Sequence, residues 1–534
     1  MAATQNPSRT WPQLADLPQA WDLIVVGGGI TGAGVLLAAV RAGLRALLLE
    51  SRDFAWGTSS RSSKLVHGGL RYLRQGRLGL TRAAVAEREN LMAQAPGLVE
   101  PLEFLVPLYR ERPPGRLAMR IGLNLYDLIA GRRTHRFMDR ATLGRTLPWL
   151  RDGGLTGACG FQDAQTDDAR LVLRILQEAR DLGAAALHYT AVEGIERDRW
   201  GRIAAVAARD SDTGASRRFT ARAVVNATGA WARRLHPAPG KGGRLRPLRG
   251  SHLVLPAARL PLPLAVSFGH PRDGRGVFVL PWHGVVLAGT TDLDHDQDLD
   301  LEPRATPAEI HYLLEAVGYI APGARIRAED LIGTQAGVRP VVAGRSRRAP
   351  SDESREHAVW VDNGLVTVTG GKLTTFRRLA ADALAAAAPW LPARATRGRP
   401  PALFDPVPGS AALGLDLAPA ARRRLAGRYG RHLGRLLARA DPATLAPVAG
   451  TAILWAELVH AAGDEGVRHL DDLLLRRVRL GLILPGAGQV HLQRIRRLCQ
   501  PVLGWDDGRW EAEELAYRER FGHTAARAPV QRGR

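Results

Sequence analysis

Residues 57–73, GTSSRSSKLVHGGLRYL, gather side chains that can bind anions and accept protons. Four serines, one lysine, one histidine, two arginines and one tyrosine lie among three glycines. The stretch is too polar and too rich in glycine for a core strand, and it lacks the acidic side chains of a solvated helix face. It follows directly after a glycine pattern, so its partner depends on what that pattern binds.

The glycine pattern lies between a short β-branched run at 23–26 and an alanine- and leucine-rich helix that ends near residue 42. Its glycines have the G-x-G-x-x-G spacing, and an acidic residue ends the next strand: Gly27, Gly29, Gly32 and Glu50. Such glycines let backbone N–H groups approach a pyrophosphate at a helix N-terminus, and the acid accepts hydrogen bonds from a ribose. The pattern predicts a dinucleotide site and by itself leaves FAD and NAD open.

Three later segments show the same sequence pattern of a strand followed by a turn. Residues 187–192, 221–232 and 364–384 read as further edges of the same site, so the nucleotide-binding domain is predicted to be discontinuous. Residues 240–330 are rich in strand-like runs, whereas alanine, leucine and arginine dominate after about residue 395. Arg431, Arg435 and Arg439 have the spacing of one helix face, which would meet solvent or anionic lipid.

Length and composition limit the number of domains, the kinds of partner and the presence of disulfides or membrane segments. The 534 residues allow two or three domains, and the net charge of +22 favours anionic partners, with a general preference for arginine as the alternative. Cys159 and Cys499 are the only cysteines, so a disulfide framework is not expected. We expect no secretory signal in residues 1–20 and no transmembrane helix, because the apolar stretch at 23–40 contains the glycine cluster.

Ten motifs together resemble one family, the FAD-dependent glycerol-3-phosphate dehydrogenases of the aerobic, flavin-linked type. The resemblance covers about residues 20–500 and rests on GGGITGAG, GTSSRSSKLVHGGLRYL, AVAEREN, IGLNLYDLIAG, TDDARLVL, NATGAWA, GSHLVLP, PWHGVVLAGTTDLD, AGVRP and GGKLTTFRRLA. Several of these motifs are long and occur in order, so the resemblance is specific.

The resemblance implies an α/β fold (α+β overall) in three parts. These are a discontinuous Rossmann-like FAD-binding domain of the glutathione-reductase/D-amino-acid-oxidase type, a β-rich substrate domain and an all-α C-terminal domain. The predicted boundaries are 20–395 for the oxidoreductase region, with FAD segments at 20–95, 155–238 and 330–395 and substrate segments at 96–154 and 239–329, then 396–522 for the helices and 1–19 and 523–534 for flexible ends.

The resemblance also implies an activity. Family members oxidise sn-glycerol 3-phosphate to dihydroxyacetone phosphate with FAD, and electrons leave to a membrane quinone. This predicts a protein on the inner, cytoplasmic face of the cytoplasmic membrane, held peripherally by its positive charge. The oligomeric state stays open, with a homodimer as one alternative.

The matching motifs supply the candidate site residues. Those expected to act on the substrate or its protons are His67, Arg71, Tyr72, His252, Arg339, Arg355 and Lys372, with either histidine as the base. Those expected to hold FAD are Gly27, Gly29, Gly32, Glu50, Thr58, Ser59, Ser62, Ser63, Lys64, His67, Gly68, Val192, Gly229, Gly371, Lys372, Leu373 and Thr374. Lys64 and Lys372 are two of only three lysines, which suggests that a compact ammonium is needed there.

Three other interpretations fit the sequence less well. An oxidase branch of the family uses oxygen and often carries an insertion after the substrate domain, for which the spacing here leaves no room. A nucleic-acid-binding flavoprotein would need a concentrated basic patch with exposed aromatics, but aromatics are only 6% of the chain. Residues 292–302 resemble a calcium loop, but Gln297 and Pro303 replace its glycine and glutamate, so an acidic surface loop is expected and no metal.

Overall fold

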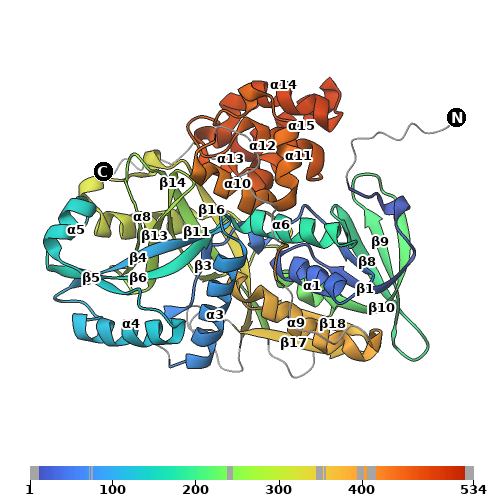
Figure 1. Ribbon diagram of the computed structural model, residues 1–534, viewed down its shortest axis with the longest axis horizontal. Helices are drawn as coiled ribbons and strands as arrows, with labels where there is room; N and C mark the ends of the chain where they lie inside the picture. Colours follow the sequence, from blue (N-terminus) through green and yellow to red (C-terminus); the bar gives the residue numbers. More distant parts are fainter. Residues whose placement is uncertain are drawn as a thin grey trace, which may run out of the picture.

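A computed structural model describes residues 11–70, 73, 76–236, 244–343, 353, 356–393, 402–405 and 417–522. The ends at 1–10 and 523–534, for which flexibility was predicted, lie outside the described residues. Figure 1 shows two sheets side by side, with the helices of the C-terminal region, in orange and red, packed above them.

The first sheet has eight strands and contains the predicted strand-turn-helix-strand unit. Its main order is β17-β18-β10-β1-β2-β7, and β8 and β9 extend it beside β10. The bounds are β1 Ala20–Val26, β2 Ala46–Leu49, β7 Ala185–Leu187, β8 Thr190–Arg197, β9 Ile203–Asp210, β10 Ser216–Asn226, β17 His357–Asp362 and β18 Leu365–Gly370. Strands β2, β1, β10 and β18 are parallel neighbours. Their apolar runs are buried, as in a sheet covered on both faces.

The second sheet has ten strands, mostly antiparallel. Its order is β15-β11-β14-β13-β12-β4-β6-β3, with β16 on β11 and β5 on β6. The bounds are β3 Leu65–Val66, β4 Val99–Tyr109, β5 Arg136–Met138, β6 Leu155–Thr166, β11 Arg244–Pro256, β12 Ala265–Gly269, β13 Gly276–Trp282, β14 Val285–Gly289, β15 Leu293–Asp294 and β16 Gly333–Ala343. Strands β6 and β16 therefore pair in this sheet, although the sequence analysis assigned both to FAD segments.

Helices cover both sheets. α1 and α9 pack with α6 over the first sheet, while α5 and α8 cover one face of the second. The bounds are α1 Ile30–Arg41, α3 Leu78–Gln94, α4 Arg116–Ala130, α5 Arg140–Thr146, α6 Asp168–Asp181, α7 Ala232–Leu235, α8 Pro307–Ile320 and α9 Phe376–Ala387. α4 lies along the lower edge in Figure 1, on the side away from the C-terminal helices.

The C-terminal region is helical, and its core is continuous with the second sheet. It contains α10 Pro419–Tyr429, α11 Leu433–Ala438, α12 Trp455–Asp464, the π-helix η13 Asp472–Arg477, α13 Leu480–Ile483, α14 Leu492–Leu503 and α15 Asp507–Gly522. The three arginines of the predicted row do not share one continuous α-helix: Arg431 lies in the 3-10 turn Gly430–His432, Arg435 lies in α11, and Arg439 follows the end of α11. Arg431 then pairs with Asp405, and Arg439 with Asp464.

Among the described residues, every helix is too short or too polar to cross a membrane.

His469 links the helical domain to its surroundings and makes its stability depend on pH. Its Nδ1 lies 2.9 Å from Glu513 Oε1, and its Nε2 lies 3.7 Å from Asp212 Oδ1. Burial alone would lower the pKa of His469, but Glu513 and nearby Asp472 raise it to about 9. The charged imidazole therefore stabilises the fold fully below about pH 6.5, and this contribution is lost as the pH rises through about 9.

We predict that His469→Gln flattens this pH dependence. Between pH 6.5 and 9.5 the free energy of unfolding of the parent should fall by about 1–2 kcal/mol more than that of the variant, since solvent screens part of the interaction. Denaturant unfolding at each pH measures the difference. Glu513→Gln should flatten the curve in the same way, and equal slopes in all three proteins would contradict the assignment.

Candidate cofactor and substrate site

A cavity of about 1520 Å³ lies between the two sheets. The glycine turn after β1, the ends of β10 and β18, and residues 56–59 and 61–63 line one part of it, and β16 with the second sheet lines another. The carboxyl ends of neighbouring parallel strands meet here, which is where open α/β sheets bind nucleotides. The volume exceeds that of ordinary small-molecule pockets and suits a dinucleotide together with a second ligand.

The glycine turn is closed by backbone contacts that side chains would prevent. Gly27 has φ of 109°, and a Cβ on Gly32 would lie 1.8 Å from Gly27 O. Glu50 Oε2 accepts a hydrogen bond from Gly28 N at 2.6 Å, and its Oε1 accepts one from Arg52 N at 2.8 Å. Burial raises the pKa of Glu50, and these N–H donors oppose the rise. The turn thus places a half-buried acid at the cavity wall, beside backbone N–H groups close to the start of α1.

Most of the predicted cofactor residues line the cavity. They are Gly27, Gly29, Glu50, Thr58, Ser59, Ser62, Ser63, His67, Val192, Gly229, Gly371, Lys372, Leu373 and Thr374. Ser59 Oγ also accepts from Ile30 N at 2.9 Å, so the serine segment and the start of α1 hold each other. Their roles toward a ligand stay predictions.

Lys64 was predicted to hold FAD, but it lies behind the wall of the cavity. Its ammonium is fully buried, 2.8 Å from Asp168 Oδ2, and it donates to Ser60 O at 2.7 Å. Burial lowers the pKa of Lys64 to about 7, opposed by Asp168. Lys64 therefore interacts with an internal carboxylate of α6, behind the residues that line the cavity.

Three more predicted residues also lie behind the lining. Gly32 packs within the turn, and Gly68 allows close packing, since a Cβ there would lie 2.1 Å from Tyr126 Oη. His252 is buried, with its Nε2 2.8 Å from Ser63 Oγ. Burial, Arg339 and Lys64 hold the pKa of His252 well below its usual range, so its ring is neutral and reaches the cavity through Ser63. Arg71, Tyr72 and Arg355 lie outside the described residues.

Arg339 on β16 faces the cavity and is held by the loop that follows β14. Its Nη2 donates to Thr290 Oγ1 at 2.8 Å, and its Nη1 lies 3.1 Å from Asp292 Oδ1. Thr290 and Asp292 also line the cavity, although the sequence analysis left them unassigned. They belong to the quoted motif that ends in GTTDLD, so that motif carried the signal.

The acidic run at 292–302 contacts arginines. Asp292 is buried rather than part of a surface loop, and Glu302 accepts from Arg61 at 2.8 Å and pairs with Arg520. Arg61 itself lines the cavity and lies over the ring of Trp56, 4.7 Å from its centroid. Arg61 belongs to the 57–73 motif and Trp56 directly precedes it, and neither was predicted as a site residue.

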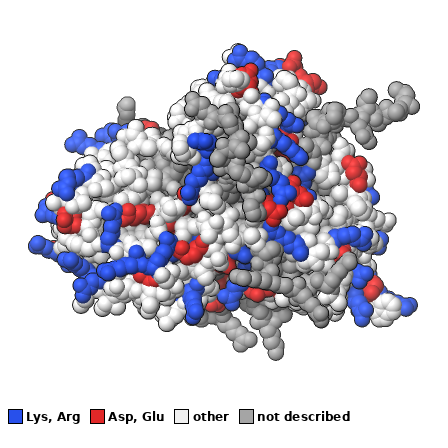
Figure 2. Space-filling model, viewed as in Figure 1, with Lys and Arg blue, Asp and Glu red and all other residues white. Residues whose placement is uncertain are grey.

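The cavity continues in an apolar branch toward α4. Its walls include apolar side chains of the second sheet, of α4 and of the segments that precede α3 and α4: Phe104, Phe161 and Phe278, then Met119, Ile121 and Leu125, then Leu70, Leu73 and Pro114. Leu117, Ile121 and Leu128 of α4 are 63%, 61% and 78% exposed. In Figure 2, Lys and Arg side chains gather along the lower left edge, where Figure 1 draws α4. The branch therefore leads to an exposed apolar helix face bordered by positive charge.

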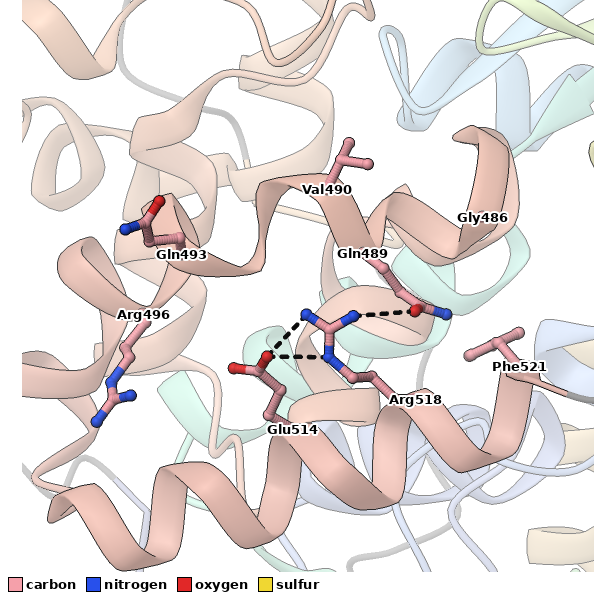
Figure 3. Close-up of a pocket in the computed structure, with 8 residues that line it drawn as sticks. All are labelled: Gly486, Gln489, Val490, Gln493, Arg496, Glu514, Arg518 and Phe521. Carbon is pink, nitrogen blue, oxygen red and sulfur yellow. Dashed lines mark hydrogen bonds and ion pairs between the residues drawn. The ribbon is translucent and has the colours of Figure 1, made fainter.

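A second cavity, of about 680 Å³, lies in the helical domain between η14 Pro485–His491, α14 and α15. Figure 3 shows Arg518 joined to both Glu514 and Gln489, with Val490 standing apart from these bonds. The residues that line this second cavity are remote in sequence from the glycine turn, and their charges are paired: Arg518 with Glu514, and Arg496 with Asp507 outside the cavity.

The lining of the large cavity fits FAD. The glycine turn leaves no room for side chains where a pyrophosphate would approach, Glu50 suits a ribose, and serine hydroxyls follow along the wall. The fold and this site define an FAD-dependent oxidoreductase. A family model described as FAD dependent oxidoreductase matches residues 22–386, and one described as the C-terminal domain of alpha-glycerophosphate oxidase matches residues 368–510.

Known relatives make the family more specific. Glycerol-3-phosphate dehydrogenase 2 of Mycobacterium bovis is 37% identical over 97% of this chain and 91% of its own. The aerobic glycerol-3-phosphate dehydrogenase of Staphylococcus haemolyticus is 32% identical over 86% of each. The glycerol-3-phosphate dehydrogenase of Bacillus halodurans, solved with FAD, superposes with a TM-score of 0.73 at 28% identity over 97% of each chain.

The chain therefore belongs to the FAD-dependent glycerol-3-phosphate dehydrogenase/oxidase family. The predicted family, fold class and cofactor are confirmed.

We predict that Gly32→Ala abolishes FAD retention, because its Cβ would overlap Gly27 O and open the turn. The flavin absorbance per protein after purification measures the loss. Gly318→Ala in α8 is the matched control, since its Cβ would have nothing within 4 Å. A Gly32→Ala protein with full flavin content would show that the turn tolerates a side chain.

Proposed function

We propose that this protein oxidises sn-glycerol 3-phosphate to dihydroxyacetone phosphate and passes the electrons to a membrane quinone. One observation carries the proposal: a single cavity joins the glycine turn, a wall with Arg339 and Lys372, and an apolar branch that ends at α4. The names of the relatives support the substrate, and the apolar branch supports a lipid-soluble acceptor.

Different residues of the cavity are suited to the phosphate and to the hydroxyl group of the substrate. Arg339, oriented by Thr290 and Asp292, binds the phosphate dianion through charge-assisted hydrogen bonds. Arg71, Tyr72 and Arg355 are proposed as further substrate contacts on the family resemblance alone. Lys372 lies on the cavity wall at the start of the short helix η7 Leu373–Thr375, where its ammonium can bind the substrate hydroxyl.

Two histidines can accept the hydroxyl proton. His67 lines the cavity directly, whereas His252 reaches it through Ser63 Oγ. A neutral imidazole has a free lone pair that can accept a proton, although burial, Arg339 and Lys64 lower the pKa of His252 and so weaken it as a base. When bound, FAD supplies the acceptor for the hydride of the substrate carbon.

A quinone is favoured over oxygen by the shape of the cavity. Oxygen needs no wide apolar path, but a quinone with a hydrocarbon tail does. The exposed Leu117 and Leu128 beside Arg116 and Arg120 suit the surface of an anionic bilayer, where leucines enter the acyl region and arginines meet headgroups. We therefore propose peripheral contact through α4 with the inner face of the cytoplasmic membrane. An oxidase is the second candidate.

Anaerobic spectra test the substrate and the acceptor. Glycerol 3-phosphate should bleach the flavin band of the purified protein, while glycerol should leave it unchanged. A soluble quinone analogue should then restore the band much faster than air. No bleaching would overturn the substrate, and faster recovery in air would favour the oxidase.

We predict that Arg339→Gln raises the KM for glycerol 3-phosphate roughly 10- to 100-fold with FAD retained, because one charged hydrogen-bonding partner of the phosphate is lost. Steady-state kinetics with a soluble dye as acceptor measures the change. Arg259→Gln, which removes an exposed pair with Asp330, is the control and should leave KM unchanged. Loss of FAD instead would assign Arg339 to the cofactor.

We predict that Leu117→Gln/Leu128→Gln weakens binding to vesicles of anionic lipid roughly tenfold or more, since two leucines no longer enter the apolar region. Sedimentation with the vesicles measures the fraction of protein bound. The activity with a soluble dye as acceptor should stay unchanged. Val490→Gln/Leu515→Gln is the matched control, because these residues are 83% and 59% exposed on the helical domain. Equal binding by both double variants and the parent would remove α4 from the proposal.

A further inference from the structure

Three arginines at the end of the π-helix η13 reach from the helical domain to the segment that follows the glycine turn. They are Arg476, Arg477 and Arg479, and each side chain is at most 2% exposed. π-helices are rare and often occur at functional sites. Arg479, directly after η13, has a left-handed backbone with φ of 65°. Burying three guanidinium groups carries a desolvation cost, so the contacts of these arginines indicate what the cluster holds in place.

Asp53 is the first contact of the cluster. Its carboxylate accepts from Arg477 Nη1 at 2.5 Å and Nη2 at 2.8 Å, and also from Arg476 Nε. Burial alone would raise the pKa of Asp53, but Arg477 and Arg476 hold it below its usual range. A bidentate guanidinium–carboxylate pair fixes both position and orientation.

Asp53 lies within the segment that closes the cofactor turn. Three residues earlier, Glu50 Oε2 accepts from Gly28 N at 2.6 Å, and two residues later Ala55 N donates to Gly28 O at 3.0 Å. Gly28 is packed against this segment, because a Cβ there would lie 2.8 Å from Phe54 and 2.9 Å from the Glu50 side chain. A shift at Asp53 would therefore move Glu50 and the turn together.

Arg479 holds the next part of the same segment. Its Nη2 donates to Ser60 O at 2.8 Å and lies 3.3 Å from Asp168 Oδ1. Ser60 O also accepts from Lys64, and Asp168 Oδ2 accepts from Ser62 Oγ at 2.7 Å. The backbone of the serine stretch is thus fixed from the side opposite the cavity.

Two carboxylates and one histidine in and beside this cluster are side chains of the kinds that bind metal ions. One ligand atom from each of Asp53, His188 and Asp472 lies within 4.8 Å of the others. However, both oxygens of Asp53 accept from guanidinium groups, and Asp472 Oδ1 accepts from Arg476 Nη2 at 2.6 Å. The arginines already supply the positive charge that a cation would bring.

We propose that Arg477, with Arg476 and Arg479, positions residues 50–64 for FAD, so that the helical domain completes the cofactor site from behind. None of these three arginines is among the residues lining the cavity, which makes them positioning residues. The inference depends on the FAD of the family and not on the proposed substrate or electron acceptor.

The test compares two arginines that differ in what they hold. Arg477→Gln removes the bidentate partner of Asp53, whereas Arg424→Gln removes a partner of Glu457 within the helical domain. Titration of the full-length apoprotein with FAD gives the Kd, and thermal unfolding gives the loss of stability. Arg477→Gln should raise the FAD Kd roughly tenfold or more. Arg424→Gln should change it by no more than about twofold at a similar loss of stability.

A double variant covers the case in which Arg477→Gln fails to fold with Asp53 left poorly paired. Asp53→Asn/Arg477→Gln removes both partners, so it should fold and still bind FAD more weakly than the parent, but by less than the product of the effects of the two single variants. Arg477→Lys should bind FAD with intermediate affinity, because an ammonium keeps the charge but not the bidentate geometry. Parental FAD affinity in the double variant, or equal FAD loss in Arg424→Gln, would overturn the proposal.

Discussion

Buried guanidinium groups must each meet a carboxylate, and this requirement connects the parts of the molecule. Moving a charge out of water costs several kcal/mol unless a well-placed partner offsets it. Arg477 meets Asp53, 424 residues away along the chain, and Arg170 of α6 meets Glu465 beside α12. Each pair joins the helical domain to the nucleotide-binding sheet. Charge pairs therefore specify the contact of the helical domain with the nucleotide-binding side, whereas a shared apolar core joins the helical domain to the second sheet.

Local features of the fold could be predicted from the sequence because their causes are local. The β-branched run, the glycine spacing and Glu50 define a turn whose geometry depends on residues within about thirty positions. The strands that end at Asn226 and Gly370 were also recognised as edges of this site: β10 pairs with β1, and β18 pairs with β10. Motif resemblance then supplied FAD, which the glycine pattern alone left open.

The direction in which individual side chains point could not be predicted, because it depends on partners that are distant in the sequence. Lys64 and Ser63 are neighbours in one motif, yet Lys64 turns inward to Asp168 while Ser63 lines the cavity. His252 and His67 were both candidates for the base, but the pairing of β11 places His252 behind Ser63. A motif identifies which residues matter, whereas the partner that each one meets comes from the assembled fold.

Arginine is used in two ways in this chain, and the distinction bears on its charge. Buried arginines such as Arg88, Arg170 and Arg477 are neutralised by adjacent carboxylates, so they contribute little to the external field. The excess of +22 must then reside on exposed side chains and on residues outside the described ranges. Exposed arginines such as Arg116 and Arg120 flank the apolar face of α4, where the cavity ends. Internal pairing thus concentrates the uncompensated charge at surfaces, including the one proposed to meet anionic lipid.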